Sequence, residues 1–131
     1  MADRLRRTAF NRLDERAEYP TAENVRILEC WNRADDPLVS IARARLAAGD
    51  SSEVHWLNGV DERFVILAGR GVLEAGGIAD QALAPGDVAF VPAGARQRLH
   101  NPGPDDLVFL CVCTPRFTPG CYHAGEPPGE A

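Results

Sequence analysis

Hydrophobic and polar residues alternate along most of the chain after Gly49, and short turn sequences interrupt the alternation at even spacing. A period of two residues is typical of strands with one buried face. The expected strands span residues 24–31, 38–47, 53–57, 61–68, 70–75, 78–83, 87–91, 96–101 and 106–114. Because no helical periodicity interrupts this run, a parallel βαβ sheet is excluded, and the pattern predicts an all-β antiparallel sandwich or closed barrel.

The N-terminal segment, residues 2–17, has a different pattern. Its apolar residues lie four apart, at Leu5, Ala9, Leu13 and Ala17. This spacing indicates a short amphipathic helix, and an extended arm packed on a neighbour is the alternative. Either element should end at Tyr19, because the residue before Pro20 avoids the helical region.

The C-terminal segment after Thr114 is predicted to be irregular but anchored by Phe117 and Tyr122. Residues 124–131 are rich in Gly, Pro and Glu and are expected to be disordered. The predicted organisation is one domain over 1–131, with an N-terminal arm (1–23), a barrel (about 38–115) and a flexible tail (about 118–131).

The charge of the chain excludes some classes of partner. The net charge is −5 and all 14 basic residues are arginine, with no basic cluster beyond the first residues, so we expect no nucleic-acid binding. No apolar stretch is long enough for a signal peptide or a membrane span, so we expect no membrane contact. The four cysteines are therefore expected to be thiols in a reducing compartment, which predicts a cytoplasmic protein.

Two segments carry residues at a spacing that resembles a known family. The first has Gly49, His55, Glu62 and Gly69; the second has Gly86, Pro92, Gly94 and Asn101. These positions resemble the two sequence motifs of the cupins, small single-domain bacterial members in particular. The resemblance covers roughly residues 38–115 and implies a jelly-roll β-barrel.

The same resemblance implies a metal site, because cupins typically bind a metal through two histidines and a glutamate of the first motif and one histidine of the second. Here His55 and Glu62 occupy two of these four positions, whereas Leu57 and Gln97 stand at the other two. The family's ligand set is therefore incomplete in this chain.

Strand alternation indicates where these side chains point. If the inward faces meet, His55, Glu62 and Gln97 converge in a cavity lined by Leu57, Phe64, Ile66 and Leu99. The three polar residues could hold a divalent ion (Zn, Fe, Mn or Ni) with water completing its shell. The alternative is a metal-free cluster in which the same groups satisfy one another by hydrogen bonds.

Other reactive or aromatic side chains are expected outside this set. Arg63, Arg96 and Arg98 should point away from the cavity, and His100 and His123 should be partly exposed. Cys111 and Cys113 share one face of a strand and are expected to behave as small apolar residues. Trp56 should point out of the barrel and need a cover, which predicts a homodimer.

Two functions remain open on the sequence. The first is a metal-dependent enzyme, an oxygenase or isomerase acting on a small polar organic molecule, with Glu62 as the best candidate general base. The second is a non-catalytic cupin that binds or senses a small molecule without metal.

Overall fold

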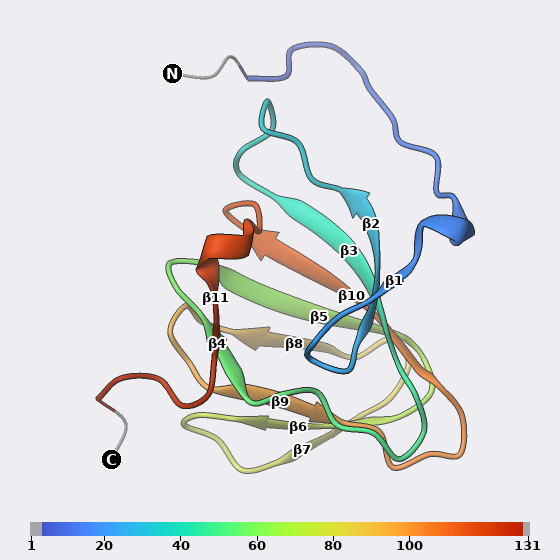
Figure 1. The fold of residues 1–131 in the computed structure, drawn as a ribbon, viewed down its shortest axis with the longest axis vertical. Coiled ribbons are helices and arrows are strands. Elements are labelled where there is room, and N and C mark those ends of the chain that lie inside the picture. Colours follow the sequence, from blue (N-terminus) through green and yellow to red (C-terminus); the bar gives the residue numbers. More distant parts are fainter. Residues whose placement is uncertain (1–3, 130–131) are drawn as a thin grey trace.

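The computed structural model of the protein describes residues 4–129, which form eleven strands and two short 3-10 helices (Figure 1). One sheet contains, in order, β1 (Tyr19–Pro20), β2 (Arg26–Trp31), β3 (Ser40–Leu46), β10 (Leu107–Thr114), β5 (Asp61–Ala68) and β8 (Val88–Val91). The other contains β11 (Tyr122–Ala124), β4 (His55–Leu57), β9 (Gln97–His100), β6 (Gly71–Ala75) and β7 (Gln81–Leu83). All pairs within the two sheets are antiparallel, which confirms the predicted all-β jelly-roll barrel.

The interior of the barrel is built from residues that alternate along each strand. On β5, Glu62, Phe64 and Ile66 are buried while the residues between them are partly exposed. Phe64 meets Phe109 of β10 edge to face, with ring centroids 5.4 Å apart. The pleat places every second side chain on one face of the sheet, so the pattern seen in the sequence becomes the apolar core.

Each of the nine expected strands is present, within about three residues of its expected bounds. The turns between them use glycine where the backbone requires it. At Gly69, which has a φ of +79°, an added Cβ would collide with the backbone oxygen of Asp106. Only glycine fits both the conformation and the space at this position.

Of the two alternatives for residues 2–17, helix or extended arm, the described part of the segment forms the arm; residues 2 and 3 lie outside the described residues. A single 3-10 turn spans Glu15–Ala17, and residues 4–14 form an arm without regular structure. Leu5 and Ala9 are partly buried, whereas Phe10 and Leu13 are 73% and 50% exposed, so the segment does not pack one continuous apolar stripe on a surface of the described chain. A short amphipathic helix needs such a surface, because local propensity alone is too weak to stabilise it.

The C-terminal segment is more ordered than expected, although residues 130 and 131 lie outside the described residues. A 3-10 turn, η2 (Pro119–Cys121), leads into β11, which pairs with β4. Pro127, within the expected disordered end, is buried. The tail is irregular apart from these two short elements, and β11 covers the outer edge of β4, which would otherwise be unpaired.

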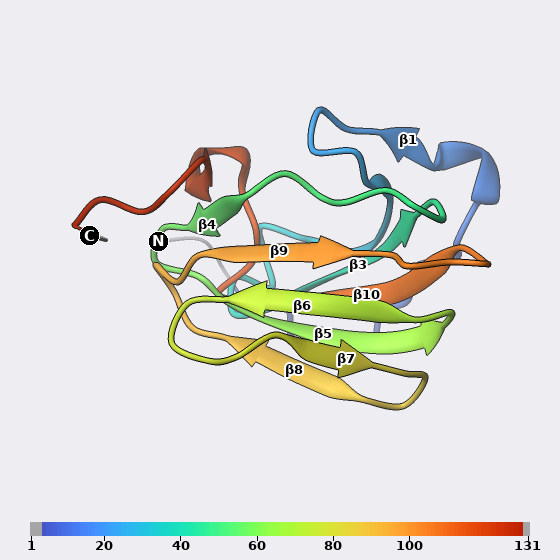
Figure 2. The ribbon, with the colours of Figure 1, turned by 90° about the horizontal axis from the view of Figure 1, so that it is seen from below.

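In Figure 2 the segment around β1 and the C-terminal segment both lie above the barrel, at opposite ends of it. Neither 3-10 turn is long or apolar enough to span a bilayer, and the described residues contain no other helix.

Candidate functional site

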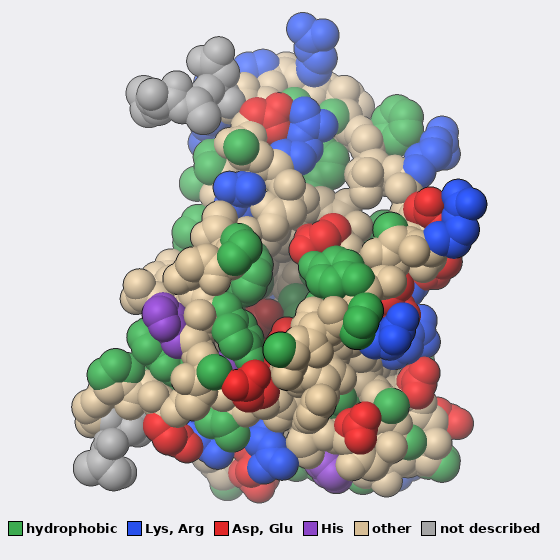
Figure 3. Space-filling view, viewed as in Figure 1, with side chains coloured by type: hydrophobic (Ala, Val, Ile, Leu, Met, Phe, Trp, Pro, Cys, Tyr) green, Lys and Arg blue, Asp and Glu red, His purple; other side chains and the backbone are tan. Residues whose placement is uncertain are grey.

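A cavity of about 340 Å³ opens between the two sheets. The barrel strands supply its walls, and the segments around β1 and η2 supply residues at its rim. Figure 3 shows the corresponding hollow, with hydrophobic and acidic side chains gathered around it. The volume lies at the lower end of the range for small-molecule pockets.

His55 is held on β4 in one orientation. Its Nδ1 lies 2.7 Å from the backbone oxygen of Glu53, so Nδ1 carries the proton and donates it, which leaves Nε2 as the acceptor nitrogen. The ring stacks on Tyr122 at a centroid distance of 4.8 Å. Burial lowers the pKa of His55, so the imidazole is neutral at pH 7.

Glu62 on β5 is 7% exposed and lies against β10. The Cys113 thiol donates to its Oε2 at 3.7 Å, a weak contact. Burial raises the pKa of Glu62, and hydrogen bonds from Gln97, Cys111 and Cys113 oppose the rise without cancelling it. A buried carboxyl with a raised pKa is a candidate proton donor or acceptor.

Gln97 on β9 lies directly opposite His55 in the β4–β9 pair. The side chain is 2% exposed and lines the cavity. Its Oε1 has no hydrogen-bond partner among the described residues. A buried acceptor without a donor is costly, so this atom is available to a donor in the cavity, whether water or a ligand.

The structure brings together nearly all of the expected pocket. His55, Leu57, Glu62, Phe64, Gln97 and Leu99 line the cavity. Ile66 does not; it is 1% exposed and packs in the core cluster instead. Ile66 shares the inward face of β5, but it lies four residues beyond Glu62, where side chains fill the barrel. The functional role of the lining residues stays a prediction.

Sequence reasoning missed the contribution of the terminal segments to the site. Glu23 precedes β2, and its Oε2 lies 3.9 Å from His55 Nδ1. Burial, and then the charges of Glu62 and Glu53, raise the pKa of Glu23 to about 7. Tyr122, expected only as an anchor, donates to Glu53 at 3.3 Å. Burial and the nearby glutamates raise the pKa of its hydroxyl. No local motif marks these residues, because tertiary packing alone brings them to the cavity.

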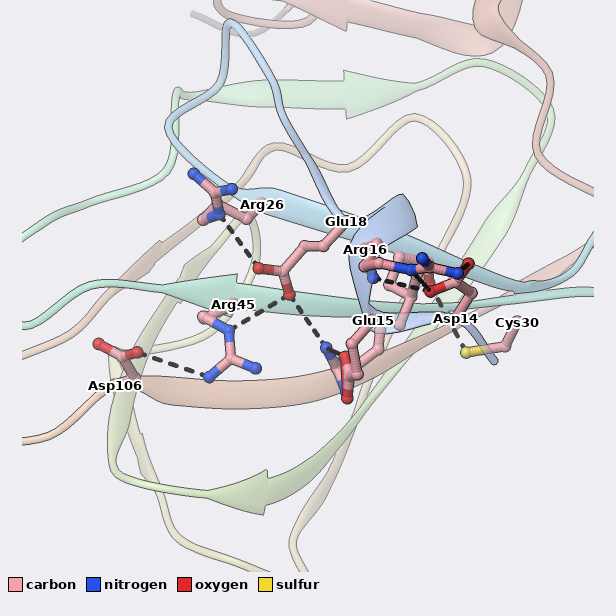
Figure 4. Close-up of polar contacts among 10 residues, drawn as sticks. Asp14, Glu15, Arg16, Glu18, Arg26, Cys30, Arg45 and Asp106 are labelled. Carbon is pink, nitrogen blue, oxygen red and sulfur yellow. Dashed lines mark hydrogen bonds and ion pairs between the residues drawn. The ribbon is translucent and has the colours of Figure 1, made fainter. Parts of the chain in front are cut away.

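A cluster of ion pairs holds the N-terminal segment in place (Figure 4). Glu18 accepts from Arg26, Arg43 and Arg45 at 3.0–3.3 Å. Arg43 also forms a bidentate ion pair with Glu15, in which its Nη1 and Nη2 donate to the two carboxylate oxygens. The Glu18 and Arg43 side chains are only 14% and 13% exposed, so these pairs fix the chain just before the residues that reach the rim.

The donor atoms fit a resident metal only in part. The Nε2 of His55, the carboxylate of Glu62 and the unpartnered Oε1 of Gln97 are legitimate ligands. Within residues 4–129, however, no three His, Cys, Asp or Glu side chains are grouped so that they could hold an ion. The protein would therefore supply one imidazole, one carboxylate and one neutral amide, which makes a weak site.

The other charged, cysteine and aromatic residues named in the sequence analysis lie largely where strand alternation predicted. Arg63, Arg96, Arg98 and His100 do not line the cavity. Cys111 and Cys113 do line it, and all four cysteines are free thiols. Trp56 is partly exposed outside the cavity, and the ring of His123 stacks on it at 4.4 Å. Part of the cover expected from a second copy thus comes from the same chain.

Comparison of the sequence with known proteins identifies a matching family and a curated relative. The Cupin domain family matches residues 42–113. An oxalate-binding protein of Thermotoga maritima is 38% identical over 71 residues, which are 54% of this chain and 58% of that relative. The chain thus spans less than two thirds of the curated relative that it matches.

Solved structures agree on the barrel. A predicted oxalate decarboxylase from Thermotoga maritima is 30% identical, with a TM-score of 0.62 over 69% of this chain and 79% of that one. A Cupin 2 conserved barrel domain protein from Salinispora arenicola is 23% identical, with a TM-score of 0.69 over 82% of this chain and 89% of that one. Because the family match covers more than half of the sequence and the fold agrees with it, the chain belongs to the cupin family.

Proposed function

We propose that the protein binds a small organic molecule in its barrel cavity, without a resident metal. The observation that carries this proposal is the Oε1 of Gln97, a buried acceptor in the cavity with no donor among the described residues. Its cost to the folded protein, about 1–3 kcal/mol for a neutral group, is offset when a ligand donates to it.

The lining around this atom supports small-molecule binding. Leu57, Phe64 and Leu99 give the ligand apolar surface, while His55 and Glu62 add polar atoms. A cavity with apolar walls and a few convergent polar groups is the usual form of a ligand site in a domain of this size.

A thermal-shift screen of neutral, cationic and anionic small molecules tests the proposal. We expect at least one chemical class to raise the melting temperature of the wild-type protein. Replacing Ala42, which lines the cavity, with leucine should abolish the shift by filling the space. Ala82→Leu, on exposed β7 outside the cavity, is the matched control and should bind normally. Binding that survives Ala42→Leu would place the ligand elsewhere and contradict the proposal.

A second candidate function is a metal-dependent oxygenase or isomerase, which the unpartnered Gln97 Oε1 also favours. His55, Glu62 and Gln97 would hold the ion, which when bound would act as a Lewis acid. Glu62 would also be the candidate general base for the substrate. Metal analysis of the purified, untagged protein tests this function. One bound ion per chain, lost in Gln97→Leu, would support it; metal far below one per chain, with no stabilisation by added ions, would contradict it.

A homodimer is proposed for the intact protein, in the cytoplasm where free thiols persist. Val88 and Phe90 of edge strand β8 are 61% and 54% exposed, which leaves an apolar strip beside an unpaired edge. Light scattering on the eluting protein measures the mass directly. A mass of one chain, 14.2 kDa, would contradict the dimer.

A further inference from the structure

The charges that line the cavity are of one sign. Glu23, Glu29, Glu53 and Glu62 contribute side chains to the lining. No arginine of the described chain does so, and the sequence has no lysine. The one basic side chain in the lining is His55, whose Nδ1 donates to the backbone oxygen of Glu53. Burial raises the pKa of Glu23 and of Glu62, so these two carboxyls ionise fully only when a cation pairs with them. The lining therefore favours a cation over an anion.

A second observation independently calls for a hydrogen-bond donor. Gln97 is 2% exposed and lines the same cavity as the glutamates, yet its Oε1 has no partner among the described residues. Carboxylates and an amide oxygen are all acceptors. The group that satisfies them together must carry several N–H or O–H bonds, and a positive charge strengthens each of these bonds.

The cavity lining also contains aromatic rings. Tyr19, Phe117 and Tyr122 line the cavity beside the glutamates. The face of an aromatic ring attracts a cation, by about 0.5–2 kcal/mol according to its desolvation. Figure 3 shows hydrophobic and acidic side chains side by side around the hollow, so a ligand with both a charged and an apolar part meets matching surface.

We infer that the ligand is a small organic amine bound as its ammonium ion, whose N–H groups donate to Gln97 Oε1 and to Glu62 while its hydrocarbon part lies against the aromatic residues. This inference rests on the proposed function and adds the chemical class of the ligand. It separates this chain from the relatives with oxalate in their names, because a dicarboxylate would bring two negative charges to a lining that has four glutamates and no arginine.

Three probes of nearly equal shape test the charge of the ligand: benzylamine, benzyl alcohol and benzoate. Binding is measured by isothermal titration calorimetry at neutral pH, on protein dialysed against EDTA so that no bound ion screens the glutamates. We expect benzylamine to bind at least about tenfold more tightly than benzyl alcohol, and benzoate not to bind at about 10 mM. Benzoate binding as tightly as benzylamine, or no benzylamine binding at that concentration, would overturn the inference.

Single-residue variants then test whether the glutamates of the cavity produce the preference for benzylamine. Glu62→Gln should weaken benzylamine binding by about tenfold or more and change benzyl alcohol binding by less than about twofold. Glu23→Gln provides a second variant with the same expectation if Glu62→Gln does not fold. Asp80→Asn, in the exposed loop before β7, is the control and should bind both probes as the wild type does. Equal losses for both probes would overturn the role of charge.

Failure of this inference and failure of the proposed function give different results. If neutral and anionic molecules bind in the cavity and amines do not, and Ala42→Leu abolishes that binding, the cavity is a ligand site but the assignment to amines is wrong. If no class of molecule in the screen binds in an Ala42-dependent manner, both proposals fail.

Discussion

Replacing Glu23 with glutamine should stabilise the ligand-free protein, and the gain should depend on pH. Burial and the charges of Glu62 and Glu53 raise the pKa of Glu23 from 4.5 to about 7. A carboxyl with a raised folded-state pKa destabilises the protein where it is ionised. The penalty is absent below pH 4.5, grows between pH 4.5 and 7, and is complete above that.

The size of the stabilisation by Glu23→Gln follows from the unfolded-state and folded-state pKa values of Glu23. At about 1.4 kcal/mol for each pH unit between them, the full penalty is about 3 kcal/mol. The Glu23 side chain keeps 21% of its surface exposed, so some of the charge remains hydrated and we expect about 2–3 kcal/mol. For a domain of this size, such a gain raises the melting temperature by about 8–12 °C.

Urea unfolding of metal-free wild type and Glu23→Gln, at pH 4.5 and at pH 8, measures this difference. We expect equal stability at the lower pH and the full gain at the higher one. Asp80→Asn, an exposed carboxylate outside the cavity, controls for net charge and should show no such change. A gain of equal size at both pH values, or a loss at pH 8, would refute the reasoning.

Three further changes test the fold around the site. Asn101→Ala should lower the free energy of unfolding by about 3 kcal/mol or more, measured in urea, because a fully buried amide bonded to two carbonyls and one N–H is lost. Gly69→Ala should prevent folding or lower the melting temperature far more than Gly77→Ala, whose added Cβ meets no atom within 4 Å; equal effects would contradict the close approach at Gly69. His123→Ala should expose Trp56, shift its fluorescence to longer wavelength and cost about 0.5–1.5 kcal/mol, and an unchanged spectrum would contradict the stacking.

The barrel and the centre of the site could be predicted from the sequence because the relevant information is local. Alternation along each strand decides which side chains face inward, so the convergence of His55, Glu62 and Gln97 follows once the strands face one another. Alternation does not say where along the barrel the space remains open, and for that reason Ile66 was assigned to the pocket although it fills the core.

The rim of the site could not be predicted, because it depends on contacts between distant segments. Glu23 reaches the cavity through a turn that follows the ion pairs of Glu18 with arginines on β2 and β3. Tyr122 reaches it because β11 pairs with β4. Neither contact has a sequence signature, and both segments had been expected to be peripheral.

The position of the rim has a consequence for how this family diversifies. Glu23 and Tyr122 lie outside residues 42–113, the part that matches the family. The rim residues and the centre of the site thus come from separate parts of the sequence. Exchange of these flanking segments between two cupins with similar barrels would therefore test whether the rim selects the ligand independently of the barrel.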